Sequence, residues 1–278
     1  MFTNHVSEAK SRKATKHTAP IQTSLVVDVK TGKVLHEQNS KVSVYPASLT
    51  KLMTLYLMFE GLESGILSMS QKFLVSEKAT KTAPGNLGVK AGSYITVRDA
   101  ILALIVRSAN DVSFVVAENM AGTEANFAKI MTARARQLGM KNTQFKNAHG
   151  LHDPLQKTTA RDMAKLAIAI KRDYPKYYPY FSRTHFVFNG KTIRGHNKVT
   201  ENYAGAEGLK TGYLCASGFN LVTTASRNNK SLLAVVTGGR TAASRDKNMT
   251  QLLDKHFNNK QAPIKVASNS KAKLLKRN

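Results

Sequence analysis

The sequence predicts a mixed α and β fold, in which strands from both ends of the chain form one antiparallel sheet flanked by helices. β-rich runs lie near both ends, at residues 24–36 and 219–237, and helical patterns fill the space between them as an inserted lobe. No internal repeat or linker divides the 278 residues. We therefore expect one folded domain at residues 20–258, between basic tails at residues 1–19 and 259–278.

The composition indicates a strongly basic globular protein. Lys and Arg number 42 against 17 Asp and Glu, which gives a net charge of +25. Such a field attracts anionic envelope polymers or lipid headgroups, while no helix-turn-helix or aromatic-rich basic pattern predicts specific nucleic-acid binding. The single cysteine, Cys215, excludes an intramolecular disulfide. No apolar run reaches the ~18 residues of a membrane span, and residues 1–18 show no apolar signal-peptide segment.

The first elements are a hairpin and a buried helix. Two β-rich runs surround a turn at Thr31-Gly32. Residues 46–62 then read as a helix that is apolar on every side, which is typical of a buried helix. Ser48 and Lys51 lie three residues apart near its start, so their side chains share one face of the first turn. A hydroxyl and an amine thus meet at the entry of a core helix, where a nucleophile and its base are expected.

Four more helices are predicted in the middle of the chain, after a polar segment at residues 68–95. Thr96 with Asp99, Thr123, and Thr159 with Asp162 supply their caps. A break at residues 108–111 separates the first helix of this group from the second. The expected helices cover residues 97–106, 112–120, 124–138 and 160–172.

The C-terminal third returns to strands. Residues 186–193 predict a hairpin turned at Asn189-Gly190, the strongest short-range turn signal. Strands are expected at residues 219–225 and 232–237, followed by a closing amphipathic helix at residues 243–257.

Three short motifs suggest a common active site: Ser48-x-x-Lys51, Ser108-x-Asn110 and Lys210-Thr211-Gly212. Each has a second copy elsewhere in the chain, so only context separates them. The first is the copy that opens a buried helix, the second lies at a break between two helices, and the third precedes a strong strand at a sheet edge. In this order the three motifs form a signature of penicillin-recognising serine enzymes.

These motifs, together with Thr159–Met163, Ser217–Val222 and Gly238–Thr241, resemble those of the serine-type D-alanyl-D-alanine carboxypeptidases, the low-molecular-weight penicillin-binding proteins. The resemblance covers residues 20–258. It implies a β-lactamase/transpeptidase-like fold, an enzyme without a cofactor or metal, and a location in the periplasm or cell envelope. It also implies a peptidoglycan stem peptide ending in D-Ala-D-Ala as substrate, and β-lactams as inhibitors.

The resemblance further implies a role for each site residue. Ser48 is acylated, Lys51 is its base, and Ser108 relays a proton to the leaving D-alanine. On the substrate side, Asn110 donates to the peptide backbone. Lys210 and Thr211 hold the terminal carboxylate with support from Arg240. The backbone N–H groups of Ser48 and Tyr213 form the oxyanion hole.

The proposed base must be uncharged to act. A serine hydroxyl is a weak nucleophile until its proton is taken. For Lys51 to do this near pH 7, its pKa must fall from ~10.4 by about 3 units, which corresponds to roughly 4 kcal/mol. Burial and a nearby cation both act in this direction, and Lys210 is the expected cation.

Some positions depart from the family pattern. Leu214 and Cys215 follow the third motif where the family often has a hydroxyl residue. A thiol this close to the site would be reactive if exposed, but we expect a small buried side chain. Asn197-Lys198 replaces a frequent Asn-Arg pair. His149 and His152 lie in a loop without a third ligand, so no zinc site is expected. The residues after Asn258 are expected to be too few for the C-terminal β-domain and anchor helix of most members.

Alternative interpretations are open at this stage. Ser108 and Asn110 are also good helix caps, and Arg240 also fits an exposed surface arginine. A β-lactamase shares the three motifs but needs a glutamate placed to drive deacylation. A non-catalytic, cationic envelope- or polyanion-binding protein with this fold would show steep salt-dependent binding instead.

Overall fold

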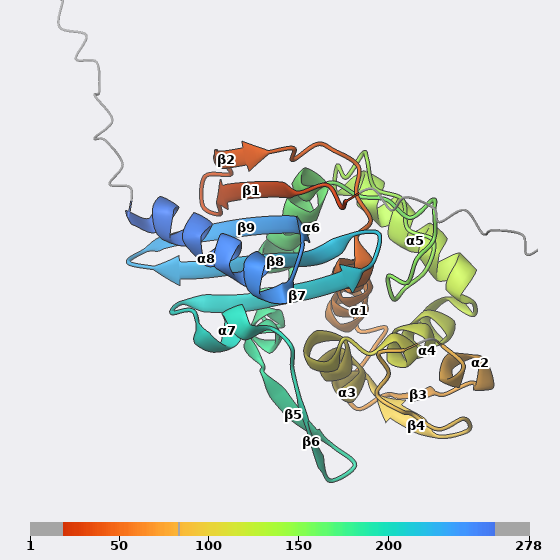
Figure 1. Ribbon diagram of the computed structural model, residues 1–278. Coiled ribbons are helices and arrows are strands. Elements are labelled where there is room, and N and C mark those ends of the chain that lie inside the picture. The colour runs from red at the N-terminus through yellow and green to blue at the C-terminus, as the bar shows by residue number, and fades with distance from the viewer. Residues whose placement is uncertain (1–18, 83, 259–278) are drawn as a thin grey trace, which may run out of the picture.

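The computed structural model describes residues 19–258 except residue 83 (Figure 1). A five-stranded antiparallel sheet has the strand order β2-β1-β9-β8-β7. The N-terminal hairpin therefore pairs directly with the last strand, as the sequence predicted. The strands of this sheet are β1 (Thr23–Asp28), β2 (Val34–Gln38), β7 (Ala206–Leu214), β8 (Gly218–Arg227) and β9 (Lys230–Gly239).

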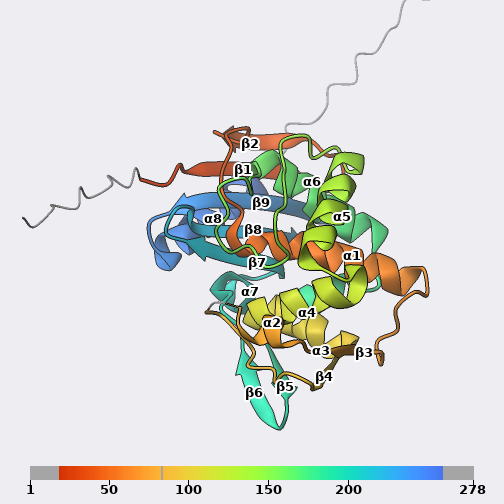
Figure 2. The same cartoon turned by 90° about the vertical axis from the view of Figure 1, so that its right-hand side faces the viewer.

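Helices cover both faces of the sheet. Helix α8 (Ala242–Asn258) packs on one face through Met249 and Leu253. Helices α1 (Lys51–Glu63) and α6 (Ala160–Asp173) lie on the other side, and Figure 2 shows α1 running between the sheet and the remaining helices. The larger core surrounds α1. The predicted sheet with an inserted helical lobe is confirmed.

Helix α1 is buried on all sides, as expected, but it begins differently. A 3₁₀ turn, η1 (Ala47–Thr50), precedes it, with Pro46 as the N-cap and no side-chain capping bond. Ser48 therefore lies inside the turn and does not cap it. The α-helix itself begins only at Lys51, which is fully buried.

The helical lobe is built from short capped helices. The side chains of Thr96, Thr123 and Thr159 each accept a hydrogen bond from the backbone N–H three residues on, which confirms the predicted caps. The predicted helix at residues 97–106 changes into a π-helical segment, a feature frequent at functional sites. The lobe contains α2 (Glu77–Thr80), α3 (Val97–Leu102), the π segment η2 (Ala103–Arg107), α4 (Asn110–Ala121) and α5 (Glu124–Gln137).

Smaller elements complete the fold. The hairpin turned at Asn189-Gly190 is present as predicted, and it projects away from the body in Figure 1. The remaining elements are the hairpin β3 (Lys72–Leu74) and β4 (Tyr94–Thr96), the hairpin β5 (His185–Phe188) and β6 (Lys191–Arg194), η3 (Tyr178–Ser182) and α7 (Lys198–Asn202).

Strand β7 was not predicted, and it corrects the placement of the third motif. Lys210, Thr211 and Gly212 precede the predicted strand, now β8, but they themselves lie within a strand. Two glycines and the charged residues of this segment interrupt the alternation of polar and apolar residues by which a strand is recognised. The expected position at a sheet edge is confirmed, because β7 pairs only with β8.

The predicted basic tails lie outside the described residues apart from residue 19. Among the helices that the structure describes, we find none with the length and apolar character needed to cross a membrane.

Candidate active site

A cavity of about 540 Å³ opens between the helical lobe and β7. Five of the eight residues predicted for the site line it: Ser48, Ser108, Asn110, Thr211 and Tyr213. Lys51 and Lys210 lie just behind its wall, with exposed fractions of 0% and 2%. The three motifs, scattered over more than 160 residues of sequence, thus meet at one cavity.

The amine of Lys51 is surrounded by oxygen atoms. Its Nζ lies 3.1 Å from the Ser48 hydroxyl, 2.7 Å from Oδ1 of Asn110 and 2.5 Å from the backbone carbonyl of His149. A protonated amine can donate to all three, whereas a neutral amine has two N–H groups and one lone pair. With both N–H groups donated to Asn110 and His149, the lone pair faces Ser48. That is the arrangement a base needs to take the proton of the hydroxyl.

Two buried lysines at the cavity both have a lowered pKa. Burial lowers the pKa of Lys51 well below its usual range, and the charge of Lys210 lowers it further, while Asp111 acts in the opposite direction. Burial, followed by the charge of Arg245, lowers the pKa of Lys210 to about 7. The expectation that burial and Lys210 would depress the pKa of Lys51 is confirmed in direction and cause.

Two glycines allow the backbone to close tightly around Ser48. A Cβ atom at Gly150 would lie 1.9 Å from the carbonyl oxygen of Ala47, and one at Gly212 would lie 3.0 Å from the backbone nitrogen of Ser48. Strand β7 therefore approaches the turn η1 closely, and Ser48 and Tyr213 line the same cavity. This neighbourhood is what an oxyanion hole requires.

Backbone strain concentrates at the site. Six non-glycine residues in the described ranges have positive φ, and four of them are asparagines, which tolerate this conformation. The other two are Ala47 (φ 49°) and Ser108 (φ 61°). Each such residue costs on the order of 1–3 kcal/mol, and both directly precede or form part of a motif.

Ser108 and Asn110 follow the π segment at the break between α3 and α4. Ser108 lines the cavity, but no hydrogen bond joins its hydroxyl to Ser48 or Lys51 within the described part of the chain. Asn110 has a contact that the sequence did not predict, because its Oδ1 accepts from Lys51 while its Nδ2 donates to the Pro84 carbonyl at 2.7 Å. Its second N–H remains for a ligand.

The wall opposite the helices is cationic. Nζ of Lys210 donates to the Thr211 carbonyl at 3.0 Å, and Arg245 lies close enough to depress the pKa of Lys210. Arg245 lines the cavity and is only 3% exposed. Arg240, which the resemblance singled out, is exposed and is absent from the lining residues. The reason is local: Arg240 leaves the end of β9, whereas Arg245 points back from the first turns of α8.

Sequence reasoning missed three further groups at the cavity, Arg245, Arg107 and His196. Burial and the charges of Lys210, Arg107 and Lys198 lower the pKa of His196 below its usual value, although a hydrogen bond to the Arg107 backbone opposes this. None of the three belongs to a recognisable short motif. Their only sequence signal was the excess of positive charge.

Cys215 is exposed at the rim of the cavity, so the interpretation as a buried packing residue is wrong. Its Sγ lies 3.7 Å from the hydroxyl of Tyr213, whose side chain is itself largely exposed. His149 contacts Glu124, whereas His152 packs against the ring of Tyr45. Across residues 19–82 and 84–258 no group of three or more His, Cys, Asp or Glu is arranged to hold a metal.

Known proteins resemble this chain along most of its length. The sequence profile of the family described as D-alanyl-D-alanine carboxypeptidase matches residues 8–241. D-alanyl-D-alanine carboxypeptidase DacF of Bacillus subtilis is 32% identical over 241 residues, which are 85% of this chain and 62% of that protein. The chain spans about three fifths of the length of the curated relatives it matches first.

Solved structures agree. Penicillin-binding protein 5 of Haemophilus influenzae superposes with a TM-score of 0.82 at 32% identity, covering 88% of this chain and 72% of that one. Penicillin-Binding Protein D2 of Listeria monocytogenes, in its ampicillin-bound form, superposes with a TM-score of 0.78 at 28% identity, covering 84% and 96%. These neighbours confirm the predicted β-lactamase/transpeptidase-like fold. Profile, sequence identity and fold agree that the chain belongs to the D-alanyl-D-alanine carboxypeptidase family.

Proposed function

We propose that this protein is a serine hydrolase that removes the terminal D-alanine from peptidoglycan stem peptides through an acyl-enzyme at Ser48. The observation that carries the proposal is the contact between Ser48 and Lys51, in which a fully buried amine with a strongly lowered pKa lies 3.1 Å from a hydroxyl at the cavity surface. A nucleophile and a neutral base in hydrogen-bond reach are the elements of covalent acyl transfer.

The reaction follows from the positions of the side chains. Lys51 takes the proton of Ser48 while Oγ attacks the carbonyl between the two D-alanines. The backbone N–H groups of Ser48 and Tyr213 stabilise the oxyanion, a contribution for which each donor is typically worth ~10²–10³ in rate. Ser108, on the same cavity, relays the proton taken up by Lys51 to the leaving amine, so that Lys51 is neutral again. Water then hydrolyses the ester with Lys51 again as the base.

The cationic wall suits a substrate with a free C-terminal carboxylate. Lys210 and Thr211 lie on strand β7, and Arg245 lies beside them. Arginine binds carboxylates through paired N–H donors and is stronger in this role when it is desolvated. We therefore extend the predicted carboxylate site to Arg245, which would exchange part of its pairing with Asp246 for the substrate carboxylate. We place it ahead of Arg240, which does not line the cavity.

A β-lactam ring presents a similar carbonyl and carboxylate, so we also propose β-lactams as inhibitors. The Listeria neighbour is described in ampicillin-bound and cefotaxime-bound forms. Since peptidoglycan lies outside the cytoplasmic membrane, we propose the periplasm or cell envelope as the site of action. The net charge of +25 supports an additional attraction to anionic envelope polymers.

The β-lactamase alternative is less well supported. That class needs a glutamate that drives deacylation, yet none of the described residues lining the cavity is acidic. The alternative of a purely binding protein does not explain why Lys51 is buried against the hydroxyl of a cavity-lining serine. We therefore expect a penicillin adduct that decays slowly.

The test is a labelled penicillin, followed by mass spectrometry of the peptide that spans Ser48. We expect an adduct at Ser48 in the wild-type protein and none in Ser48→Ala, together with D-alanine release from a peptide ending in D-Ala-D-Ala. An adduct that survives Ser48→Ala would refute the assignment. Rapid loss of the adduct with full turnover of penicillin would favour the β-lactamase instead.

A further inference from the structure

The carbonyl of His149 decides where the lone pair of Lys51 points. The neutral amine keeps two N–H groups, and their acceptors are Oδ1 of Asn110 at 2.7 Å and the carbonyl of His149 at 2.5 Å. If this carbonyl moves, the amine can rotate and the lone pair leaves the Ser48 hydroxyl. The loop that carries His149 is therefore part of the geometry of the base, although it contains none of the three motifs.

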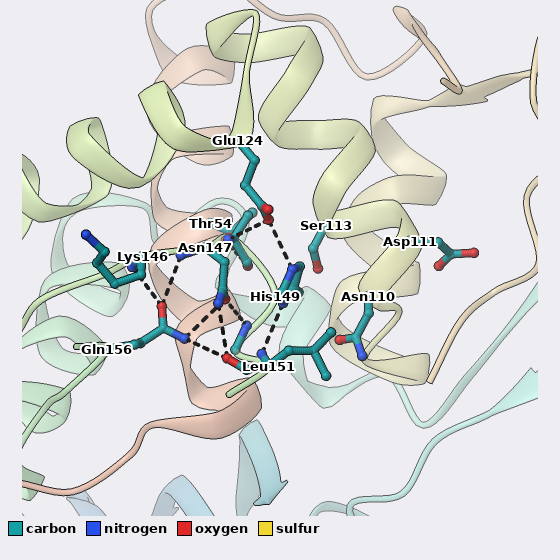
Figure 3. A network of polar contacts seen from close by, with 12 residues as sticks. Thr54, Asn110, Asp111, Ser113, Glu124, Lys146, Asn147, His149, Leu151 and Gln156 are labelled. Carbon is teal, nitrogen blue, oxygen red and sulfur yellow. Dashed lines mark hydrogen bonds and ion pairs between the residues drawn. The ribbon is translucent and has the colours of Figure 1, made fainter. Parts of the chain in front are cut away.

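That loop is fixed by an extensive hydrogen-bond network (Figure 3). Oδ1 of Asn147 accepts from the backbone N–H of Gly150 at 2.7 Å and from the Gln156 amide at 3.1 Å. Oε1 of Gln156 in turn accepts from the backbone N–H of Asn147 at 3.2 Å. On the other side, the Thr54 hydroxyl of α1 donates to the Ala148 carbonyl at 2.8 Å.

The imidazole of His149 ties the loop to α5. Its Nδ1 accepts the backbone N–H of Leu151 at 3.0 Å, so this nitrogen carries a lone pair and the ring proton sits on Nε2. Nε2 lies 3.2 Å from Oε1 of Glu124, the first residue of α5. The same Oε1 accepts the backbone N–H of Ala148 at 3.1 Å. Figure 3 shows Glu124 above the loop, with dashed lines to the His149 ring and to the loop backbone.

We propose that Glu124 is a positioning residue for the base Lys51: by binding both the His149 ring and the Ala148 N–H, it holds the His149 carbonyl against the amine. The inference rests on the proposed function. Glu124 touches neither the substrate cavity nor Lys51, and it acts through the loop alone. Its side chain is largely buried, and its position at the start of α5 also favours a carboxylate because of the helix dipole.

Glu124→Ala tests the proposal. We expect the rate constant of acylation by labelled penicillin, and kcat for a D-Ala-D-Ala peptide, to fall tenfold or more, since small displacements of a catalytic group have large effects on rate. The KM should stay within threefold, because the residues proposed to bind the carboxylate lie on the opposite wall. Glu124→Gln should restore the rate to within threefold of the wild type, since both contacts use Oε1, an acceptor that glutamine retains.

Glu118→Ala is the matched control. Its carboxylate also accepts a hydrogen bond from another segment, the Ser76 hydroxyl at 2.5 Å, but it does not contact the loop. We expect both alanine variants to lower the melting temperature, and only Glu124→Ala to lower the acylation rate. Equal rate losses in the two variants, or a Gln variant as slow as the Ala variant, would overturn the proposal.

A second variant keeps the test decisive if Glu124→Ala does not fold. In His149→Asn, the new amide oxygen can still accept from Leu151, but the shorter side chain cannot reach Glu124, so we expect an acylation rate at least fivefold lower. A rate equal to that of the wild type would refute the positioning role. A wild-type protein that forms no adduct overturns the proposed function and this inference with it, whereas a reactive wild type with an unaffected Glu124→Ala overturns the inference alone.

Discussion

The two walls of the cavity each contain a buried lysine, but they surround it differently. On the helical wall, Lys51 faces three oxygen acceptors. On the sheet wall, Lys210 donates to one backbone carbonyl and has the cation Arg245 as its neighbour. Both amines have a lowered pKa, and burial is the largest cause for each. Desolvation alone therefore does not distinguish the roles of the two lysines. The groups that surround each amine do.

The different surroundings suit Lys51 to proton transfer and Lys210 to recognition of the substrate carboxylate. The acceptors around Lys51 orient a neutral amine, which is the state that a base needs. Arg245 is paired with Asp246 at 2.8 Å, whereas the side-chain amine of Lys210 has only a backbone carbonyl among its contacts in the described residues, which suits an incoming carboxylate. An anion bound there would raise the pKa of Lys210 again, because an opposite charge favours the protonated form. Substrate binding and proton uptake are thus coupled at Lys210.

The largest expected effect is on the helical wall. Lys51→Met removes the base and keeps a buried unbranched side chain, so we expect the acylation rate constant to fall about 10²–10⁴-fold. Stopped-flow acylation with a fluorescent penicillin measures it. Acylation at the wild-type rate would show that another group takes the proton of Ser48. The assignment of proton transfer to the helical wall would then be wrong.

The next effect is on the sheet wall. Arg245→Gln removes a charged donor worth about 1.5–3 kcal/mol, so we expect KM for a peptide with a free carboxylate to rise about tenfold to a hundredfold. The same peptide with a C-terminal amide should be turned over equally by the variant and the wild type. Arg240→Gln tests which arginine binds the carboxylate. A larger rise in KM for Arg240→Gln than for Arg245→Gln would favour Arg240, which the family resemblance predicted, over Arg245, which the cavity geometry indicates.

Lys210→Met connects the two walls. Removing this cation removes a charge that lowers the pKa of Lys51, so we expect the acid limb of the pH profile of acylation to move to higher pH. The measurement is the acylation rate constant between pH 5 and pH 9, with a neutral ester substrate to avoid the carboxylate site. An unchanged limb would show that the two lysines do not interact.

The same variant is expected to be more stable. The pKa of Lys210 is about 7 in the folded state and about 10.5 when unfolded, so the unfolded chain binds more protons between these values and wild-type stability rises with pH there. At pH 7 the burial of this amine costs on the order of 5 kcal/mol. Thermal unfolding should therefore show a higher melting temperature for Lys210→Met than for the wild type at pH 7. The difference between the two melting temperatures should become smaller towards pH 10.

The smallest expected effect is on the pH dependence of stability, and it comes from two histidines outside both walls of the cavity. Burial lowers the pKa of His36 and of His256, which lie near each other where β2 meets α8. Because both pKa values are lower in the fold, the unfolded chain binds more protons at these side chains as the pH falls through about 6.5, so stability decreases there. Melting curves at pH 7.5 and pH 5.5 should differ less in His256→Gln than in the wild type. Equal shifts would place the acid-sensitive groups elsewhere.

The sequence predicted the helical wall better than the sheet wall. Ser48, Lys51 and Asn110 belong to short motifs next to strong helical patterns, and the buried character of α1 was readable from its residues. Strand β7 was missed because its glycines and charged residues broke the alternation. Arg245 could not be found, since its only relevant property is that α8 turns it back towards β7.

The network behind Lys51 was equally hidden. Glu124 and His149 are far apart in sequence, and the interaction depends on how α5 is packed against a loop. The two strained residues, Ala47 and Ser108, are ordinary by sequence, because a positive φ is imposed by the surrounding backbone. The local propensity of a sequence predicts single helices and strands. The Glu124–His149 contact and the two strained residues arise only when these elements pack together.

The pairing of β1 with β9 also has a consequence for biogenesis. Leu25 faces Val235 in the sheet, so the first and last strands among the described residues must find each other before the sheet closes. Long-range pairing of this kind is slow and leaves partly made chains with unpaired edges. The nucleophile is translated early and its carboxylate site late, so a nascent or truncated polypeptide should be inert towards penicillin. Covalent labelling of cells would then count only molecules that have completed folding.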